Sequence, residues 1–174
     1  MLGPWPGNRT QQFTDRYTPD DMEGYLAYVR AMVERYDGDG VDDMPGLESP
    51  IRHWEVDNEP DLKSTGSPRS TTATGFCSPQ EYAAVLVVSA EAIREANPEA
   101  VVLNGGFYRI AHPVGDRYAQ EVFAQAGVME AIDVMSIHAY HEGPGVELVR
   151  RAIANAKRIA PGKPIWLTET SVPA

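Results

Sequence analysis

Two glutamates stand where a carboxylate could act on a ligand. Glu59 follows a short apolar run in the segment 54–60 (WEVDNEP), and Glu169 follows another in the segment 164–170 (PIWLTET). Either glutamate alone could be a loop cap or a salt-bridge partner. Two together could divide proton transfer and nucleophilic attack, as retaining hydrolysis of a glycosidic bond requires of carboxyl groups about 5–5.5 Å apart. The pair therefore has the residue types that this chemistry needs.

The elements that would position these glutamates follow from the periodicity of the chain. Short apolar runs predict strands at 51–58, 101–103, 133–137 and 164–168. Helical spacing of apolar residues predicts helices at 18–36, 78–97, 116–126 and 146–159. The strand starts are 50, 32 and 31 residues apart, a spacing typical of strand–helix repeats in a parallel sheet. The predicted fold class is α/β, either an open flavodoxin-like sheet or part of a (β/α)8 barrel.

The separation of the glutamates favours the barrel. Glu59 and Glu169 are 110 residues apart, which corresponds to three strand–helix units. In an open sheet with strands about 4.8 Å apart, the two strand ends would be ~14 Å from each other. In a closed barrel, strands three places apart face each other across the mouth, where such barrels hold their active sites.

Three segments resemble one enzyme clan. The segment 54–60 resembles the W-E-x-x-N-E-P signature of clan A glycoside hydrolases, and the segment 164–170 resembles their nucleophile strand. Between them, the segment 136–140 (SIHAY) is similar to the H-x-Y of the sixth strand. The resemblance implies strands four to seven of a (β/α)8 barrel, a half barrel of about four strand–helix units. Residues 1–174 would form a single partial glycoside hydrolase catalytic domain.

The same resemblance implies a role for each matching residue. Glu59 would be the general acid/base, and Glu169 would be the nucleophile that forms the glycosyl-enzyme. Asn58 would donate a hydrogen bond to the sugar 2-hydroxyl, His138 would line the subsite near the acid/base, and Tyr140 would hold Glu169 through its hydroxyl. The implied function is double-displacement hydrolysis of O-glycosidic bonds in poly- or oligosaccharides. Both the branch with β-xylosidases, α-iduronidases and α-arabinofuranosidases and the cellulase-like branch fit.

Four aromatic residues near these motifs have two interpretations each. Side chains alternate along a strand, so the Trp54 side chain points away from that of Glu59. This favours core packing over sugar stacking. Trp5, Phe107 and Tyr108 fall in expected loops at the active edge and could form sugar platforms. A lone loop aromatic is usually incidental to function.

An acidic segment offers a weak metal signal. Asp37, Asp39 and Asp43 recur at the spacing of oxygen ligands in a short calcium loop, and Glu48 falls at its twelfth position. However, the sixth position carries Asp42 where such loops have glycine. An acidic turn without an ion is the favoured interpretation, and no other cofactor is expected.

The histidines give little support to a metal-dependent hydrolase. His138 and His141 could combine with His112 or His53, but no H-E-x-x-H motif or close Asp/His cluster accompanies them. The segment 8–10 (NRT) matches a glycosylation acceptor, which chance also explains.

Composition excludes several classes of protein. Fifteen Lys and Arg against 25 Asp and Glu give a net charge of −10, and no basic cluster suggests nucleic acid or an anionic membrane as a partner. The apolar runs are too short for a membrane span. Cys77 is the single cysteine, so no internal disulfide framework can form. A neutral carbohydrate is compatible with the acidic charge.

The length conflicts with a whole barrel. A (β/α)8 barrel needs about 250 residues, and 200 at the least, whereas this chain has 174. The alternative to an enzyme is a catalytically dead half-barrel that retains carbohydrate binding. Exposed edges of a half barrel would favour self-association. The start, Met1 to Pro4, lacks the features of a signal peptide. The localisation stays open, since the resembling clan is often secreted and a secreted or periplasmic full-length form is compatible with the sequence.

Overall fold

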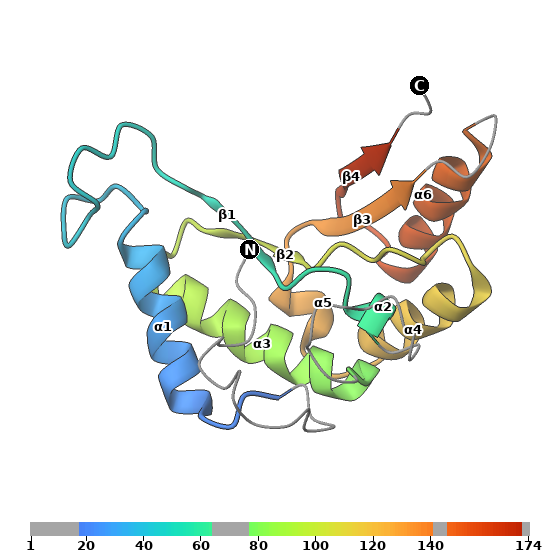
Figure 1. The fold of residues 1–174 in the computed structure, drawn as a ribbon, viewed down its shortest axis with the longest axis horizontal. Coiled ribbons are helices and arrows are strands. Elements are labelled where there is room, and N and C mark those ends of the chain that lie inside the picture. Colours follow the sequence, from blue (N-terminus) through green and yellow to red (C-terminus); the bar gives the residue numbers. More distant parts are fainter. Residues whose placement is uncertain (1–17, 64–76, 141–145, 172–174) are drawn as a thin grey trace.

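The computed structural model describes residues 18–63, 77–140 and 146–171, which form a mixed α/β structure (Figure 1). The strands are β1 (His53–Val56), β2 (Val101–Asn104), β3 (Met135–Tyr140) and β4 (Ile165–Ser171). The helices are α1 (Met22–Glu34), α2 (Pro60–Lys63), α3 (Pro79–Ala96), α4 (Pro113–Phe123), α5 (Val128–Ala131) and α6 (Glu147–Ile159). None of the helices in these ranges is long and apolar enough to cross a membrane.

The strands form a parallel row in chain order. β1 pairs with β2 and β3 pairs with β4, both in parallel. Two isolated parallel bridges, Leu103 with Val134 and Phe107 with Ile137, join the two pairs. Because parallel strands all end at one edge, the residues that follow or end β1, β3 and β4 come together there.

One irregularity in this row matters for the site. From Met135 to Ile137, each residue of β3 pairs with the next residue of β4, and Ile137 pairs with Leu167. The next residue, His138, then pairs with Glu169 and not with Thr168. Thr168 is therefore an extra residue on β4, which makes a β-bulge.

Helices cover one side of the strands and supply most of the core (Figure 1). α3 begins with a complete capping box, in which Ser78 and Glu81 each satisfy a backbone N–H of the other. Its buried face includes Tyr82, Leu86 and Ile93, and α1 packs against it. Trp54 is buried in the same core, which confirms its predicted packing role.

The element bounds differ from the sequence-based ones where local signals are weak. The helix expected at 116–126 begins at Pro113, whose fixed φ suits a first helical position, and ends at Phe123. A separate short helix, α5, follows Gly127, which has a φ of 83°. The strand expected to end at Ile137 continues to Tyr140 because its polar residues pair with β4.

β4 is exposed on both of its faces. Trp166 is 42% exposed and its chain neighbour Leu167, which points the other way, is 37% exposed. A strand in a parallel sheet is normally covered on both faces. This exposure is what an outer strand of a partial barrel would show.

Candidate active site

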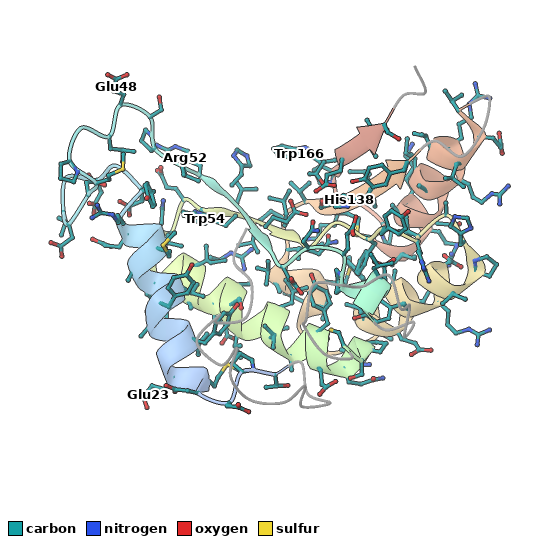
Figure 2. The ribbon with its side chains drawn as sticks, in the orientation of Figure 1. Glu23, Glu48, Arg52, Trp54, His138 and Trp166 are labelled. Carbon is teal, nitrogen blue, oxygen red and sulfur yellow. The ribbon has the colours of Figure 1, made fainter. Side chains whose placement is uncertain are left out.

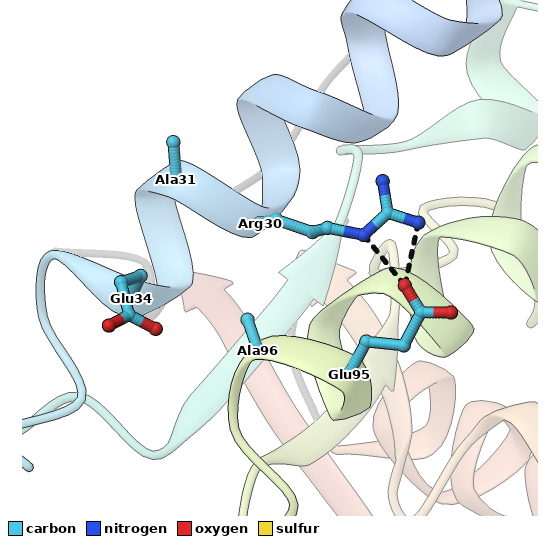
Figure 3. Close-up of a pocket in the computed structure, with 5 residues that line it drawn as sticks. All are labelled: Arg30, Ala31, Glu34, Glu95 and Ala96. Carbon is cyan, nitrogen blue, oxygen red and sulfur yellow. Dashed lines mark hydrogen bonds and ion pairs between the residues drawn. The ribbon is translucent and has the colours of Figure 1, made fainter.

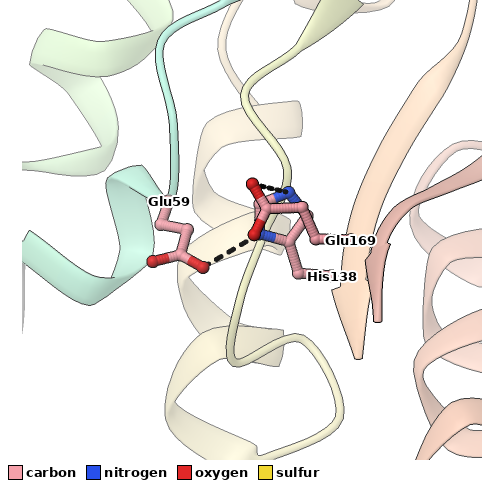
Figure 4. Close-up of side chains that lie close together, drawn as sticks. All are labelled: Glu59, His138 and Glu169. Carbon is pink, nitrogen blue, oxygen red and sulfur yellow. Dashed lines mark hydrogen bonds and ion pairs between the residues drawn. The ribbon is translucent and has the colours of Figure 1, made fainter. Parts of the chain in front are cut away.

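Glu59, His138 and Glu169 meet at the C-terminal edge of the strands (Figure 4). Nδ1 of His138 lies 2.9 Å from Oε1 of Glu59. Nε2 of the same ring lies 3.8 Å from Oε1 of Glu169. One nitrogen of His138 and one oxygen of each glutamate lie within 4.8 Å of one another. The imidazole thus has one carboxylate on each side.

The two glutamates meet because the strand row curves. Glu59 follows β1 and Glu169 lies in β4, the two outer members of the row. In a flat row these strands would be ~14 Å apart. Their starts also touch, since the rings of His53 and Trp166 have centroids 4.9 Å apart. The carboxyl groups are closer than the roughly 6.5–9.5 Å typical of inverting glycosidases.

The solvent exposure of the three side chains is graded. The side chain of His138 is 1% exposed, that of Glu59 16% and that of Glu169 42%. The imidazole is therefore fixed within the protein, whereas the Glu169 carboxylate is open to an incoming ligand.

The turn that carries Glu59 has an unusual backbone. Asp57 and Glu59 have φ values of 69° and 51°, in the left-handed region that disfavours residues with a Cβ. Pro60 then starts α2. Between the two strained residues, Oδ1 of Asn58 is buried and has no hydrogen-bond partner among the described residues. Such backbone conformations cost of order 1–3 kcal/mol each and are concentrated at functional sites.

Tyr140 supports the exposed carboxylate. Its hydroxyl donates a hydrogen bond to Oε2 of Glu169. This hydrogen bond, followed by burial, raises the pKa of Tyr140 above its ordinary value. The hydroxyl consequently stays protonated at neutral pH and remains a donor to Glu169.

Of the two interpretations of Phe107, the sugar platform is wrong. Its ring is fully buried and packs edge-on against Tyr82 and Tyr118. The cause is the bridge from Phe107 to Ile137, which extends the strand pairing and turns the ring toward the helices. Tyr108 is half-buried, with its ring centroid 5.4 Å from that of Tyr140. Trp5 lies outside the described residues.

Asp61 is a buried acid beside the site that the motifs did not indicate. Its two carboxylate oxygens accept the backbone N–H groups of Tyr108 at 2.9 Å and Arg109 at 2.6 Å. Burial raises the pKa of Asp61 to about 6, against the opposing effect of these hydrogen bonds, and Glu59 adds to the rise. Its place two residues after Glu59, in the first turn of α2, is the one signal that the sequence offers.

The acidic segment gathers three of its four predicted ligands. Carboxylate oxygens of Asp37, Asp39 and Asp43 lie within 4.8 Å of one another. These carboxylates accept loop N–H groups, for example Asp43 from Gly40 at 2.8 Å. Glu48 does not belong to this group and is exposed in the same loop, far from His138 (Figure 2).

The remaining histidines do not extend the site. His53 stacks on Trp166, and His112 precedes α4. In the described ranges, neither belongs to the group formed by His138 and the two glutamates. His141 and the segment 8–10 lie outside the described residues.

A hollow between α1 and α3 is separate from this site (Figure 3). It is lined by Ala31, Glu34 and Ala96, and by Arg30 and Glu95, whose ion pair measures 2.6 Å. It lies near the end of α3 that leads into β2, at the opposite edge of the strands from the glutamates. Its two alanines are apolar and its Arg30 and Glu95 are paired with each other, so we assign no catalytic or binding role to it.

Known structures share this fold. The chain matches a glucosidase from Croceicoccus marinus with a TM-score of 0.66, at 16% identity over 90% of this chain and 32% of that one. It matches a family 39 β-xylosidase from Caulobacter crescentus with a TM-score of 0.57, at 23% identity over 88% and 31% of the two chains. It matches a psychrophilic family 10 endo-β-1,4-xylanase with a TM-score of 0.55, at 21% identity over 85% and 44%.

These comparisons establish the fold class but not a family. No protein-family model matches the sequence. No curated protein sequence matches it either. The structural neighbours are TIM-barrel glycoside hydrolases, and the chain spans about a third to less than half of their length. The α/β structure described above is therefore consistent with part of such a barrel.

Proposed function

We propose that this chain carries the catalytic pair of a retaining glycoside hydrolase, with Glu59 as acid/base and Glu169 as nucleophile. The observation that carries the proposal is the approach of these two carboxylates to within 4.8 Å at the C-terminal edge of parallel strands. The fold shared with glycoside hydrolases supports a carbohydrate substrate.

The first step would form a glycosyl-enzyme. The Glu169 carboxylate attacks the anomeric carbon, and the bond from that carbon to the leaving oxygen breaks. Glu59, protonated at this stage, gives its proton to the leaving oxygen. The Tyr140 hydroxyl, which donates to Glu169, would orient the attacking carboxylate.

The second step would release the sugar. Glu59, now ionised, takes a proton from a water molecule whose oxygen attacks the anomeric carbon. The ester bond to Glu169 breaks, the carboxylate is regenerated, and Glu59 is again protonated. One glycosidic bond is thereby hydrolysed with retention of configuration.

Asn58 and His138 would assist without bonding covalently to the sugar. Asn58 would donate a hydrogen bond from its Nδ2 to the sugar 2-hydroxyl, while its Oδ1 is buried. His138 contacts Glu59 through Nδ1, and its 1% exposed ring would hold the acid/base from within the protein rather than touch the sugar.

Hydrolysis of aryl glycosides tests this proposal. A panel of aryl β-glucoside, β-xyloside and α-arabinofuranoside is assayed with the wild type, Glu59→Gln and Glu169→Gln. The exposed Glu130 on α5 supplies a matched control, Glu130→Gln. We expect both site variants to lose at least about 10³-fold in kcat, as removal of catalytic groups does. A 2-deoxy-2-fluoroglycoside should also leave a covalent adduct on the peptide containing Glu169.

A carbohydrate-binding half barrel without catalysis is the second candidate. The exposed ring of Trp166 on β4 supports it, because an aromatic surface is available for a sugar to pack on. Equal hydrolysis rates for the wild type and both Gln variants, together with sugar binding by calorimetry, would support this candidate against the enzyme.

A further inference from the structure

A carboxylate within the strand row connects all of the segments that carry the catalytic groups. Glu55 lies in β1, and its Oε1 accepts the Gly106 backbone N–H at 2.6 Å and the Ser136 hydroxyl at 3.0 Å. Ser136 Oγ in turn lies 2.7 Å from Thr168 Oγ1. Because the single Ser136 proton goes to Glu55, Thr168 donates to Ser136.

Three members of this network lie within four residues of a proposed site residue. Ser136 is two residues before His138 and on the same face of β3. Thr168 directly precedes Glu169 in β4. Glu55 itself is four residues before the proposed acid/base in the same strand and turn. The network thus connects β1, β3 and β4 directly below the site.

Gly106 links the network to the imidazole ring. A Cβ at this position would lie 2.1 Å from Nε2 and 2.3 Å from Cδ2 of His138, so the backbone there lies directly against the ring. The Gly106 N–H is held by Glu55. Hence one carboxylate fixes the backbone on one side of the ring and, through Ser136, the strand that carries the ring.

We propose that Glu55 is a positioning residue that sets the place of the His138 imidazole between Glu59 and Glu169. Its effect on hydrolysis rests on the proposed function, whereas its effect on the ring does not. Glu55 acts through its Oε1 as a hydrogen-bond acceptor. A glutamine at this position keeps an acceptor oxygen of the same reach, and an alanine removes it.

The direct test is the NMR signal of the His138 ring in the full chain. Ring ¹⁵N and ¹³C shifts are compared in the wild type, Glu55→Gln, Glu55→Ala and the exposed control Glu130→Ala, with Tm measured for each. We expect Glu55→Ala to move the His138 ring signals while Glu55→Gln largely restores them. Unchanged signals in a folded Glu55→Ala protein would overturn the proposal, as would equal displacement by Gln and Ala.

A second variant covers failure of Glu55→Ala to fold. Ser136→Ala removes one of the two donors to Glu55 and leaves the Gly106 bond in place. We expect it to move the His138 ring signals by less than the loss of both bonds would. Unchanged signals in this variant, beside an unfolded Glu55→Ala, would reject the positioning role.

Hydrolysis provides the functional arm. We expect kcat to fall by about 10- to 100-fold in Glu55→Ala with KM changed less than about threefold, and Glu55→Gln to recover most of the rate. A wild type without hydrolysis but with the expected ring shifts would refute the proposed function and leave the positioning role intact. A hydrolysing wild type matched by Glu55→Ala would refute the positioning role alone.

Discussion

The hydroxyl of Tyr140 on β3 donates a hydrogen bond to Glu169 on the neighbouring β4. The two residues are joined across the strand pair just beyond the bulge at Thr168. The more exposed of the two carboxylates proposed to be catalytic thereby has a fixed partner, and that partner comes from the strand that also carries His138.

Tyr140→Phe should slow hydrolysis more than it weakens binding. A hydrogen bond to a charged group contributes about 1.5–3 kcal/mol, which corresponds to roughly a 10- to 150-fold loss in kcat. Steady-state kinetics with an aryl glycoside measures the change, with Tm as the check on folding. An unchanged kcat would show that Glu169 does not need this donor.

Gly106→Ala should displace the His138 ring. The added Cβ would lie 2.1 Å from Nε2, a distance that requires the ring or the backbone to move. We expect at least about a tenfold loss of kcat and a shift of the His138 ring signals in NMR. Retention of both the rate and the ring signals would show that the backbone after β2 can shift to accommodate the Cβ without displacing the His138 ring.

Asp61 should give the protein a distinctive dependence of stability on pH. Burial raises the pKa of this carboxyl from 3.8 to about 6, so the folded chain keeps the proton to a higher pH than the unfolded chain does. The stabilisation is complete below pH ~3.8 and is lost as the pH rises through about 6, by up to about 3 kcal/mol.

Urea unfolding of wild type and Asp61→Asn at several pH values measures this effect. Between about pH 4 and pH 7, the free energy of unfolding of the wild type should fall steadily relative to that of Asp61→Asn, because only the wild type loses the proton at this position. The exposed Glu130→Gln is the control. A difference that stays constant over this range would contradict the raised pKa.

Tyr82→Phe should destabilise the fold. The Tyr82 hydroxyl donates to the Val56 carbonyl at 3.1 Å and accepts the Gly105 N–H at 2.7 Å, and all three groups are buried. Its removal leaves unsatisfied backbone groups, at a cost of about 2–3 kcal/mol in free energy of unfolding. Tyr36→Phe, at a half-buried position, is the matched control and should cost less than about 0.5 kcal/mol.

Calcium should have little effect on stability. The carboxylates of Asp39 and Asp43 already accept N–H groups of their own loop, and Glu48 does not join them. Differential scanning fluorimetry with millimolar calcium and with chelator should give Tm values within about 1 °C of each other. A rise in Tm that grows with calcium concentration would instead indicate a bound ion.

The sequence was sufficient for those parts of the fold and site that depend on local signals. Capping residues such as Ser78 and apolar residues at helical spacing predict the helices, and short apolar runs predict the strands. Polar residues at strand ends come together because parallel strands end at one edge. That rule places Glu59 and Glu169 at the same edge, and their approach further requires the strand row to curve as it does in a barrel.

The remaining features depend on pairing between distant segments. Phe107 looks like a loop residue until its bridge to Ile137 is known. Asp61 looks like an ordinary first-turn acid until the segment containing Tyr108 folds over it. The left-handed backbone of Asp57 is equally invisible, since residues with a Cβ rarely adopt it without tertiary constraint.

The extra residue in β4 decides which side chains of this strand reach the site. Side chains alternate along a strand, yet Thr168 and Glu169 both reach the face of β3 that carries Ser136 and His138. Without the extra residue, Glu169 would take the place of Thr168 opposite His138, and the strand would lose the hydroxyl that contacts Ser136. The bulge therefore lets β4 present two consecutive side chains, the Thr168 hydroxyl and the Glu169 carboxylate, to one face of the strand row.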